Sequence, residues 1–442
     1  MKKALFFLLS LSLSATAQTP DRPLSTAQPP APVSPAVFED AVAEWWQHPI
    51  AVSLRIPYPR TVAGAIARNG DILACEYAQE TGKVRRTVVG RAIVDDHCCP
   101  ALWAADGRRA VVAWTNHNAD RLIRLRVGGR SGDTGEWEPE TSIDLGAPAS
   151  YTQLHRLRAE SDTAQDTFLV FSRSGNSNWG ITTFRVDQAT GRLEVTRPFR
   201  VIFNGNGKQA YLSTADAYPT TGNQVIRVCT SFNPAAQAHD LHYFEIDAVT
   251  GEVRSPVTPG LSGNIFTSVG MPVSEAALTP LLAGVPGESR RLFYVRSGPL
   301  PPAVAYADWS VSSPDSATYK LLRFDPEKAV WVSESFGLAG PRIGYKPEAN
   351  YLPGMAFPTP AYEEVFYLAR RRSDNTATTL ERYEKPAGDS AYRQTVLTAS
   401  DRKLARPYPP VGGGPIRLFY TEFSTYGADY TDFSGSMKPV TE

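Results

Sequence analysis

Two histidines placed symmetrically about a tight turn are the first candidates for chemistry in this chain. The sequence holds six histidines, and two of them, His97 and His117, flank the stretch Pro100–Trp114. In that stretch two apolar runs are joined by Asp106-Gly107, a strong short-range signal for a β-hairpin. Gly107 is the midpoint between the two histidines, so both imidazoles are expected on one rim, at the open end of the hairpin. We predict that this pair belongs to an active site.

A second pair of residues repeats this geometry further along the chain. Tyr151 opens YTQLHRL, Arg173 closes the apolar run Phe168–Ser172, and their midpoint is Asp162 in a polar turn. If such hairpins follow one another around an axis, Tyr151 and Arg173 reach the rim that carries the histidines, and Tyr211 follows one unit later. Polar groups that converge in a concavity are the usual mark of a ligand site.

These residue types can transfer protons and neutralise an anion. Glycoside hydrolysis normally needs two carboxyl groups about 5–10 Å apart, and Asp95-Asp96 has no evident partner. No elbow or oxyanion motif marks a serine nucleophile. The set does fit proton abstraction beside a carboxylate. Arg173 would neutralise a uronate, while one His or Tyr takes its α-proton and another protonates the leaving oxygen. The residues favour β-elimination, for which we expect no metal and no cofactor.

The elements that must position these residues read as short strands. β-Branched and aromatic runs alternate with clusters of Gly, Pro, Asp and Asn, a pattern typical of a sandwich, barrel or propeller. Arg185–Glu194 and Glu245–Arg254 share the frame D-x-x-T-G sixty residues apart, and Leu322–Trp331 is a looser copy. A long repeat of a strand-turn-strand unit favours a β-propeller. We predict one all-β propeller domain over residues 37–442, with seven four-stranded blades and a short helix at Phe38–His48.

The start of the chain reads as an export signal. Lys2 and Lys3 precede the apolar run Ala4–Leu13 and an A-x-A-type site at Ala15-Thr16-Ala17, which together predict a signal peptide over residues 1–17. A Pro-rich linker is expected over residues 18–36. The protein is therefore expected to be secreted or periplasmic, without membrane insertion.

The charge and cysteine content of the chain bear on its binding partners and its disulfide bonds. The chain has 45 basic and 45 acidic residues, so no overall field points to nucleic acid. Four cysteines allow three pairings, and Cys75 with Cys98 or Cys99 fits neighbouring strands.

The stretch Asp95–Asn118, DDHCCPALWAADGRRAVVAWTNHN, resembles the signature D-D-H-N-S-P-A-L…D-G-R…H-N of a BNR-type propeller family that includes the propeller ulvan lyases. Three further stretches resemble family segments in the same order: Tyr151–Leu157, Phe171–Trp179 and Phe419–Phe433. The resemblance covers roughly residues 60–435.

The resemblance implies a seven-bladed polysaccharide lyase that cleaves a sulfated, uronate-containing algal polysaccharide by β-elimination. By position, His97 and Tyr151 resemble its acid–base pair, and His117 a second catalytic or orienting imidazole. Arg173 resembles the group that neutralises the carboxylate. Substrate contacts are expected from Tyr211, Asn116 and Asn178. The expected partner is thus an anionic polysaccharide, bound by a monomer.

Two alternatives stay open. Cys98-Cys99 stands where the family has Asn-Ser, and Thr152-Gln153 where it has Pro-Asn, which would suit a non-catalytic carbohydrate-binding propeller. Ser131–Trp137 (SGDTGEW) falls one residue short of the Asp-box S-x-D-x-G-x-x-W of sialidase-like glycosidases. That box is a structural turn and says little about chemistry.

Overall fold

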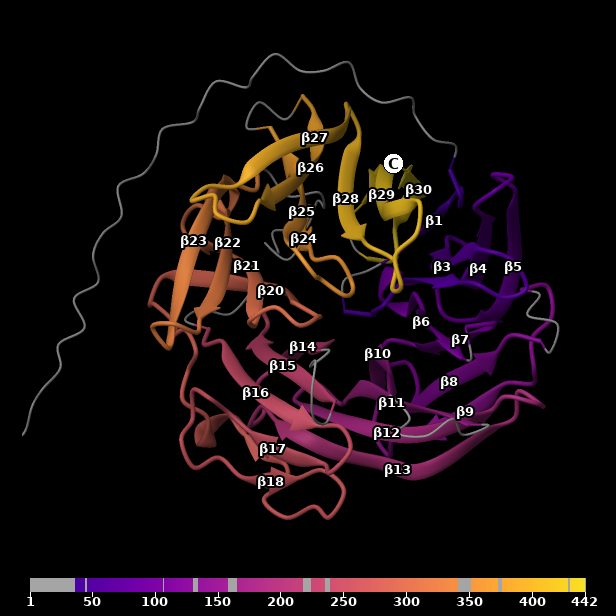
Figure 1. Ribbon diagram of the computed structural model, residues 1–442, viewed down its shortest axis with the longest axis horizontal. Coiled ribbons are helices and arrows are strands. Elements are labelled where there is room, and N and C mark those ends of the chain that lie inside the picture. Colours follow the sequence, from indigo (N-terminus) through magenta and orange to yellow (C-terminus); the bar gives the residue numbers. More distant parts are fainter. Residues whose placement is uncertain are drawn as a thin grey trace, which may run out of the picture.

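Seven sheets stand around a central axis in the computed structural model, and their strands are antiparallel apart from the parallel pair β13–β19 (Figure 1). The structure describes residues 36–43, 46–105, 107–129, 134–157, 165–217, 224–234, 239–340, 351–372, 376–427 and 430–441. The chain visits the sheets in sequence order, from indigo at the start to yellow at the end. The fold is a seven-bladed β-propeller, which confirms the predicted class and blade number.

The strands of each blade follow one another from the axis outward. Blade 1 consists of β2 (Ala51–Leu54), β3 (Arg60–Ala67), β4 (Asp71–Ala78) and β5 (Val84–Arg91), with β1 (Ala41–Val42) also paired to β3. Blade 2 consists of β6 (Ala101–Ala105), β7 (Arg109–Thr115), β8 (Leu122–Val127) and β9 (Thr141–Asp144). Blade 3 consists of β10 (Ala149–Leu157), β11 (Gln165–Ser174), β12 (Asn178–Asp187) and β13 (Leu193–Asn204), extended by β19 (Val273–Ser274). Blade 4 consists of β14 (Ala210–Asp216), β15 (Val225–Phe232), β16 (His242–Asp247), β17 (Glu252–Arg254) and β18 (Gly263–Asn264).

The later blades follow the same scheme. Blade 5 consists of β20 (Glu288–Val295), β21 (Ala303–Ser310), β22 (Thr318–Asp325) and β23 (Val330–Leu338). Blade 6 consists of β24 (Met355–Ala356), β25 (Glu364–Arg371), β26 (Thr378–Lys385) and β27 (Arg393–Ser400). Blade 7 consists of β28 (Lys403–Tyr408), β29 (Ile416–Tyr426) and β30 (Phe433–Thr441). Three short 3-10 helices complete the described elements: η1 (Asp96–Cys98), η2 (Glu275–Ala277) and η3 (Pro314–Ser316).

Burial falls from the axis to the rim of the disc. Every residue of β6 and β7 is buried, whereas β27 is exposed or half-buried along its whole length. Strands covered on both faces read as continuous apolar runs, as ALWAA and AVVAW do here. The core therefore lies between blades, packed sheet against sheet.

The repeated D-x-x-T-G frames form equivalent turns in successive blades. Asp187–Gly191 joins β12 to β13, and Asp247–Gly251 joins β16 to β17. In both turns the Asp carboxylate accepts the backbone N–H of the Thr, at 2.7 and 2.8 Å. Gly191 and Gly251 have φ of 77° and 78°, a conformation that glycine adopts without penalty. The predicted repeat is confirmed.

The predicted helix at Phe38–His48 is wrong. The described residues of that stretch contain the strand β1, and Phe38 bridges Met437 of β30. The segment Val37–Val42 thus lies between the last blade and the first, as Figure 1 shows where β1 approaches β30. Edge strands left unpaired are a liability, and pairing them closes the ring. The pairing that closes the ring stabilises an extended conformation here, and this outweighs the helical propensity of FEDAVAEWWQH.

The two faces of the disc carry different connections. Neighbouring strands of a blade are antiparallel, so first-to-second and second-to-third connections emerge on opposite faces. We call the face with the second-to-third connections, such as β7–β8, the upper face. The lower face carries first-to-second connections, such as β24–β25.

The structure also bears on the predicted disulfide, while the predicted signal peptide lies outside the residues it describes. All four cysteines are buried and none forms a disulfide, so the predicted bond of Cys75 with Cys98 or Cys99 is absent. The predicted signal peptide and all but the last residue of the linker lie outside the described residues, as do residues 131–133 of the Asp-box-like stretch. Among the described residues there is no helix of the length and apolarity that crossing a membrane requires.

Candidate active site on the upper face

The two histidines meet as the hairpin predicts. β6 pairs with β7 in the register that places the turn at Gly107. His97 lies in η1, just before β6, and His117 lies in the β7–β8 connection. Their rings stack with centroids 4.2 Å apart and planes 7° from parallel. Asp95 caps η1 by accepting the backbone N–H of His97 at 2.9 Å.

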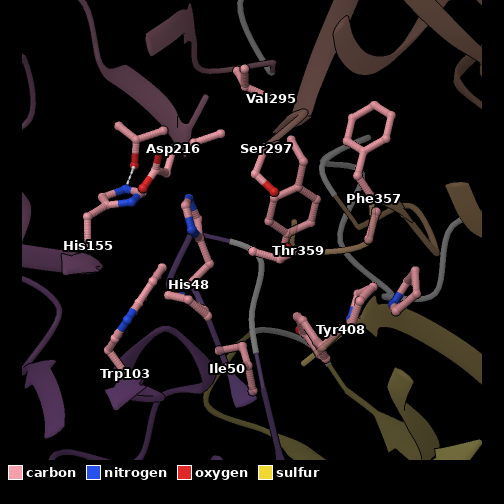
Figure 2. A pocket seen from close by; sticks show the side chains of 17 residues that line it. His48, Ile50, Trp103, His155, Asp216, Val295, Ser297, Phe357, Thr359 and Tyr408 are labelled. Carbon is pink, nitrogen blue, oxygen red and sulfur yellow. Dashed lines mark hydrogen bonds between the residues drawn. The ribbon is translucent and has the colours of Figure 1, made fainter. Parts of the chain in front are cut away.

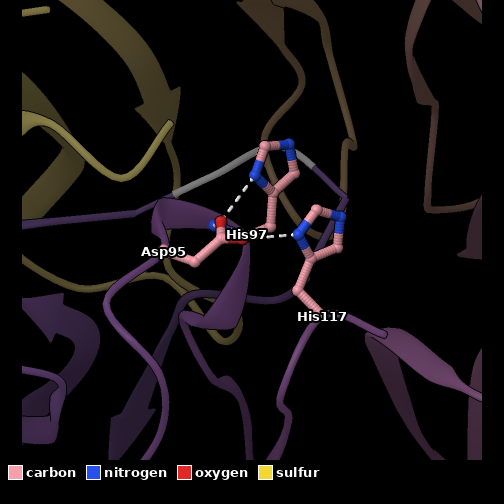
Figure 3. A group of neighbouring side chains, drawn as sticks. All are labelled: Asp95, His97 and His117. Atoms are coloured by element: carbon pink, nitrogen blue, oxygen red, sulfur yellow. Dashed lines mark hydrogen bonds and ion pairs between the residues drawn. The ribbon is translucent and has the colours of Figure 1, made fainter. Parts of the chain in front are cut away.

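One carboxylate bridges both imidazoles. His97 Nδ1 lies 2.9 Å from Asp95 Oδ1, and His117 Nδ1 lies 2.6 Å from Asp95 Oδ2. Figure 3 shows both rings turned toward Asp95 through this nitrogen, so that each Nε2 points away from the carboxylate. Because a carboxylate only accepts hydrogen bonds, this contact holds a proton on each Nδ1. The Nε2 atoms are left for chemistry.

A second carboxylate acts on His97 alone. Asp96 is fully buried, and its Oδ1 lies 2.8 Å from His97 Nδ1. Its Oδ2 accepts from Arg406 Nη2 at 2.9 Å and from the Tyr426 hydroxyl at 2.7 Å. Arg406 Nη1 also donates to the backbone oxygen of Ala43, at 2.6 Å. This network links blade 7 and the chain start to the η1 turn that precedes blade 2.

These contacts separate the protonation states of the two histidines. Burial alone would lower the pKa of His97, but Asp96 and Asp95 outweigh it and raise that pKa well above the usual value. Burial, together with the positive charge of His97, lowers the pKa of His117 despite its hydrogen bond to Asp95. At neutral pH the pair is therefore one imidazolium, His97, beside one neutral imidazole, His117.

Tyr151 and Arg173 lie next to this pair, as the second hairpin predicts. The Tyr151 ring is 5.8 Å from that of His97 and 5.6 Å from that of His117. The Arg173 guanidinium lies over the Tyr151 ring, 4.6 Å from its centroid, in a cation–π contact. Residue 162, the predicted midpoint, lies outside the described residues.

Arg173 is a buried cation with spare donors. Its side chain is fully buried, and Nη2 donates to Ser150 Oγ at 3.3 Å. Nε and Nη1 have no hydrogen-bond partner among the described residues. A buried charge without a counter-ion is costly, and such groups are normally paired. Nε and Nη1 of Arg173 are therefore available to donate to a bound group.

An aromatic cover closes over Arg173. Tyr211 lies with its ring 5.4 Å from the guanidinium and stacks on Trp46 at 4.4 Å. Tyr151 is 1 % exposed, and the Trp179 ring also stacks parallel to it, at 6.0 Å. The cover thus separates Arg173 from solvent. His97 and His117 stay more open, with side chains 10 % and 12 % exposed.

Tyr430 belongs to the site and was missed by sequence reasoning. Its ring stands edge-on against His97 and His117, at 5.1 and 5.6 Å, and its backbone oxygen accepts from Asp96 N at 3.0 Å. Trp46, Arg406 and Tyr426 were missed too. Tyr430 and Tyr426 lie in the closing segment Phe419–Phe433, so the family resemblance held a signal for these two that residue spacing did not.

Backbone strain concentrates at this site. Four of the eight non-glycine residues with positive φ among the described residues contribute to it: His117 (35°), Asn118 (70°), Tyr151 (60°) and Arg406 (60°). Such conformations cost about 1–3 kcal/mol each and gather at functional sites. The surrounding hydrogen bonds hold these residues in place, among them Asn118 N donating to Ala149 O at 2.7 Å.

The two asparagines expected to touch substrate lie at the edge of the site. Asn116 is half-buried in the β7–β8 connection and donates to Asp120 Oδ2 at 2.7 Å. Asn178 is the first residue of β12 and is half-buried on the upper face. Both lie on the predicted rim, but neither belongs to the network around Asp95.

The site also contains a potential metal-ligand set. Asp95, His97 and His117 each offer one ligand atom, all within 4.8 Å of one another, and nitrogen and carboxylate oxygen are common ligands of divalent metals. Both Nδ1 atoms, however, already contact Asp95. In this arrangement each Nδ1 is hydrogen-bonded to Asp95, and each Nε2 points away from it.

A small cavity lies deeper in the central channel, toward the lower face (Figure 2). It measures about 50 Å³, room for a few water molecules, and is lined by residues of blades 2 to 7 and of the segment just before blade 1. His155 Nε2 contacts Thr214 Oγ1 at 2.7 Å. His48 Nε2 and His155 Nδ1 are buried without a hydrogen-bond partner among the described residues. Sequence reasoning gave neither histidine a place.

Fold and site together define a propeller with a carboxylate-bridged imidazole pair beside a buried arginine. No family model matches the chain, and no curated protein matches it. The resemblance to the propeller ulvan lyases thus rests on the quoted motifs alone.

Among solved structures the likeness is remote. An α-L-arabinofuranosidase of Fusarium graminearum bound to an iminosugar inhibitor is 11 % identical, with a TM-score of 0.37, over 77 % of this chain and 91 % of that one. An α-L-arabinanase of Penicillium chrysogenum complexed with arabinobiose is 8 % identical, with a TM-score of 0.39, over 93 % and 99 %. A six-bladed fucose-recognising lectin of Aleuria aurantia is 11 % identical, with a TM-score of 0.39, over 78 % and 94 %. These values concern the fold alone and carry no argument about activity.

Proposed function

We propose that this protein is a polysaccharide lyase that cleaves a sulfated, uronate-containing polysaccharide of the ulvan type by β-elimination. The observation that carries the proposal is the polarised pair, His97 charged and His117 neutral on one carboxylate, beside the spare donors of Arg173. General base, general acid and anion binder are the three roles that the reaction needs.

The reaction assigns one role to each group. Arg173 binds the uronate carboxylate and so makes the proton on C5 more acidic. His117 Nε2 takes that proton, the electrons of the C5–H bond form the C4=C5 double bond, and the C4–O4 bond breaks. His97 gives its Nε2 proton to the leaving oxygen, while Tyr151 orients the sugar between the imidazoles and the arginine. Both histidines then return to their starting states by proton exchange with solvent.

The cover over Arg173 must open for this reaction. Tyr151 and Arg173 are closed off by Trp46 and Tyr211, so a carboxylate reaches the guanidinium only after these rings move apart. A second candidate is a propeller that binds acidic glycans without cleaving them, which the Cys98-Cys99 and Thr152-Gln153 departures from the family motif favour. We distinguish the two by product formation.

The decisive assay follows unsaturated uronyl ends by their ultraviolet absorbance during incubation with ulvan, polygalacturonate or alginate. We expect absorbance and new reducing ends to rise together. Reducing ends without absorbance would indicate a hydrolase, and saturable binding without either product would leave the binding-only candidate.

Variants test the assigned roles. His117→Ala is expected to lower kcat at least a hundredfold, the usual contribution of a positioned base. Tyr151→Phe is expected to lower kcat less, because Tyr151 orients the sugar and transfers no proton. Arg192→Gln, an exposed change in the β12–β13 turn, serves as the control and keeps the wild-type rate. Full activity in His117→Ala, with an unchanged melting temperature, would refute the assignment of the base.

A further inference from the structure

A groove on the lower face has the chemistry of an anion-binding surface. It measures about 520 Å³ and is formed by the first-to-second connections of blades 6, 7 and 1, including β24–β25 and β28–β29. The candidate active site uses the other face, with His117 in a second-to-third connection. The groove is therefore a separate surface of the molecule.

Its walls are held by backbone hydrogen bonds between blades. Val411 N donates to Ala51 O at 3.0 Å, and Ser53 N donates to Val411 O at 2.8 Å. Gly412 N donates to Thr359 O at 3.2 Å. These bonds tie the β28–β29 connection to the blades on both sides, so the groove is preformed and needs little ordering to accept a ligand.

The charges in the groove are all of one sign. Arg55 and Arg417 are the charged residues among the described residues that line it, and neither makes an ion-pair contact in the part of the chain that the structure describes. Arg417 lies close enough to Glu384, outside the groove lining, to help lower the pKa of that carboxyl group. Walls of low polarity around charges of one sign concentrate the field and attract counter-ions. The complementary ligand is an anion.

The remaining lining suits an extended polymer. Tyr362 projects from the β24–β25 connection with 67 % of its surface exposed. Three consecutive glycines, Gly412 to Gly414, leave one wall without side chains. An exposed aromatic ring beside bare backbone offers a flat surface and amide groups, which can hold a sugar ring and its hydroxyls.

We infer that this groove is a second binding site for an acidic polysaccharide, on the face opposite the candidate active site. The anionic character of the ligand rests on the groove itself, and the choice of a polysaccharide rests on the proposed function. Arg55 and Arg417 bind sulfate or carboxylate groups of the chain, and Tyr362 packs against a sugar ring.

The test compares two faces of the full mature protein. Binding of dextran sulfate, polygalacturonate, poly-glutamate and neutral dextran is measured for wild type, for Arg55→Gln/Arg417→Gln, for Tyr362→Ala and for Arg173→Met. We expect the double variant to bind both acidic polysaccharides about tenfold more weakly at low salt, the effect of losing two exposed charge contacts. Its affinity should also depend less on salt. Arg192→Gln is the matched control, since it removes an exposed charge outside the groove.

Each outcome decides the inference. Unchanged binding of both polysaccharides by the folded double variant overturns it. Groove-dependent binding of poly-glutamate as tight as that of the polysaccharides overturns the polysaccharide assignment. The groove substitutions should weaken binding by the same factor whether or not Arg173→Met is also present, because distant sites contribute independently.

Turnover separates this inference from the proposed function. If no polymer is cleaved but the groove variants still weaken binding, the proposed function fails and the groove stands. If polymers are cleaved, the groove variants should raise KM for long chains with kcat unchanged. They should leave the turnover of tetrasaccharides, too short to reach both faces, as in wild type.

Discussion

The buried histidines of the channel cavity make stability sensitive to acid. Burial lowers the pKa of His48 to about 4, and its hydrogen bond to Gln153 offsets this only in part. In the unfolded chain the same imidazole titrates near 6.5. Between these values the unfolded chain binds the proton and the folded chain does not. The stability contributed by neutral His48 is therefore complete above about pH 6.5 and is lost as pH falls toward 4.

The size of this effect follows from the two pKa values. Each unit of difference corresponds to about 1.4 kcal/mol once both states have titrated fully. At pH 5 the unfolded His48 is protonated and the folded one is still neutral, so about 2 kcal/mol of the free energy of unfolding is lost relative to pH 8. The group is fully buried, so solvent does not screen this term.

The substitution His48→Asn isolates the contribution. Asparagine keeps a hydrogen-bonding group near Gln153 but does not titrate, while His155 and His97 remain in both proteins. The free energy of unfolding is measured by urea denaturation at pH 8, 7, 6 and 5. We expect wild type to lose about 2 kcal/mol more than the variant between pH 8 and pH 5. Parallel profiles for the two proteins would show that His48 is hydrated or protonated in the fold and would refute the reasoning.

Three further predictions concern the candidate active site. Asp96→Asn removes one of the two charges that raise the pKa of His97, so the alkaline limb of the pH–rate profile should move to lower pH, and an unmoved limb would contradict the role of Asp96. Trp46→Ala removes the ring stacked on Tyr211 and should lower KM for short uronate oligosaccharides several-fold; an unchanged KM would mean that this ring does not cover Arg173 in solution. Dialysis against EDTA should leave lyase activity unchanged, because both Nδ1 atoms of the pair are engaged by Asp95; loss of activity that zinc restores would assign the three residues to a metal instead.

The sequence predicted the parts of the molecule that depend on short-range patterns. The hairpin turn at Gly107, the equivalent turns at Asp187 and Asp247 and the meeting of His97 with His117 all arise within about 25 residues. Such contacts are encoded by turn residues and by alternation along a strand. Because the blades are built alike, the same short-range contacts recur in each blade around the axis.

The features that the sequence did not predict depend on contacts between residues far apart in the chain. Arg406 contacts Asp96 across 310 residues and Tyr426 does so across 330, separations at which spacing carries no signal. The helix at Phe38–His48 failed for the same reason, since the partner of Phe38 is Met437. The burial of Arg173 follows from Trp46 and Tyr211 on other elements. Each of these needs the closed ring.

The bond between Asp96 and Arg406 has a kinetic meaning. Its partners are 310 residues apart, and Arg406 also donates to Ala43 at the seam where the ring closes. Contacts between distant parts of a chain form late, because closing a long loop costs entropy. During refolding, most strands can pair before the seam is complete, but His97 gains its full set of partners only at the last step. During refolding, enzyme activity should therefore recover later than β-structure. The delay between the two would measure the time that ring closure takes.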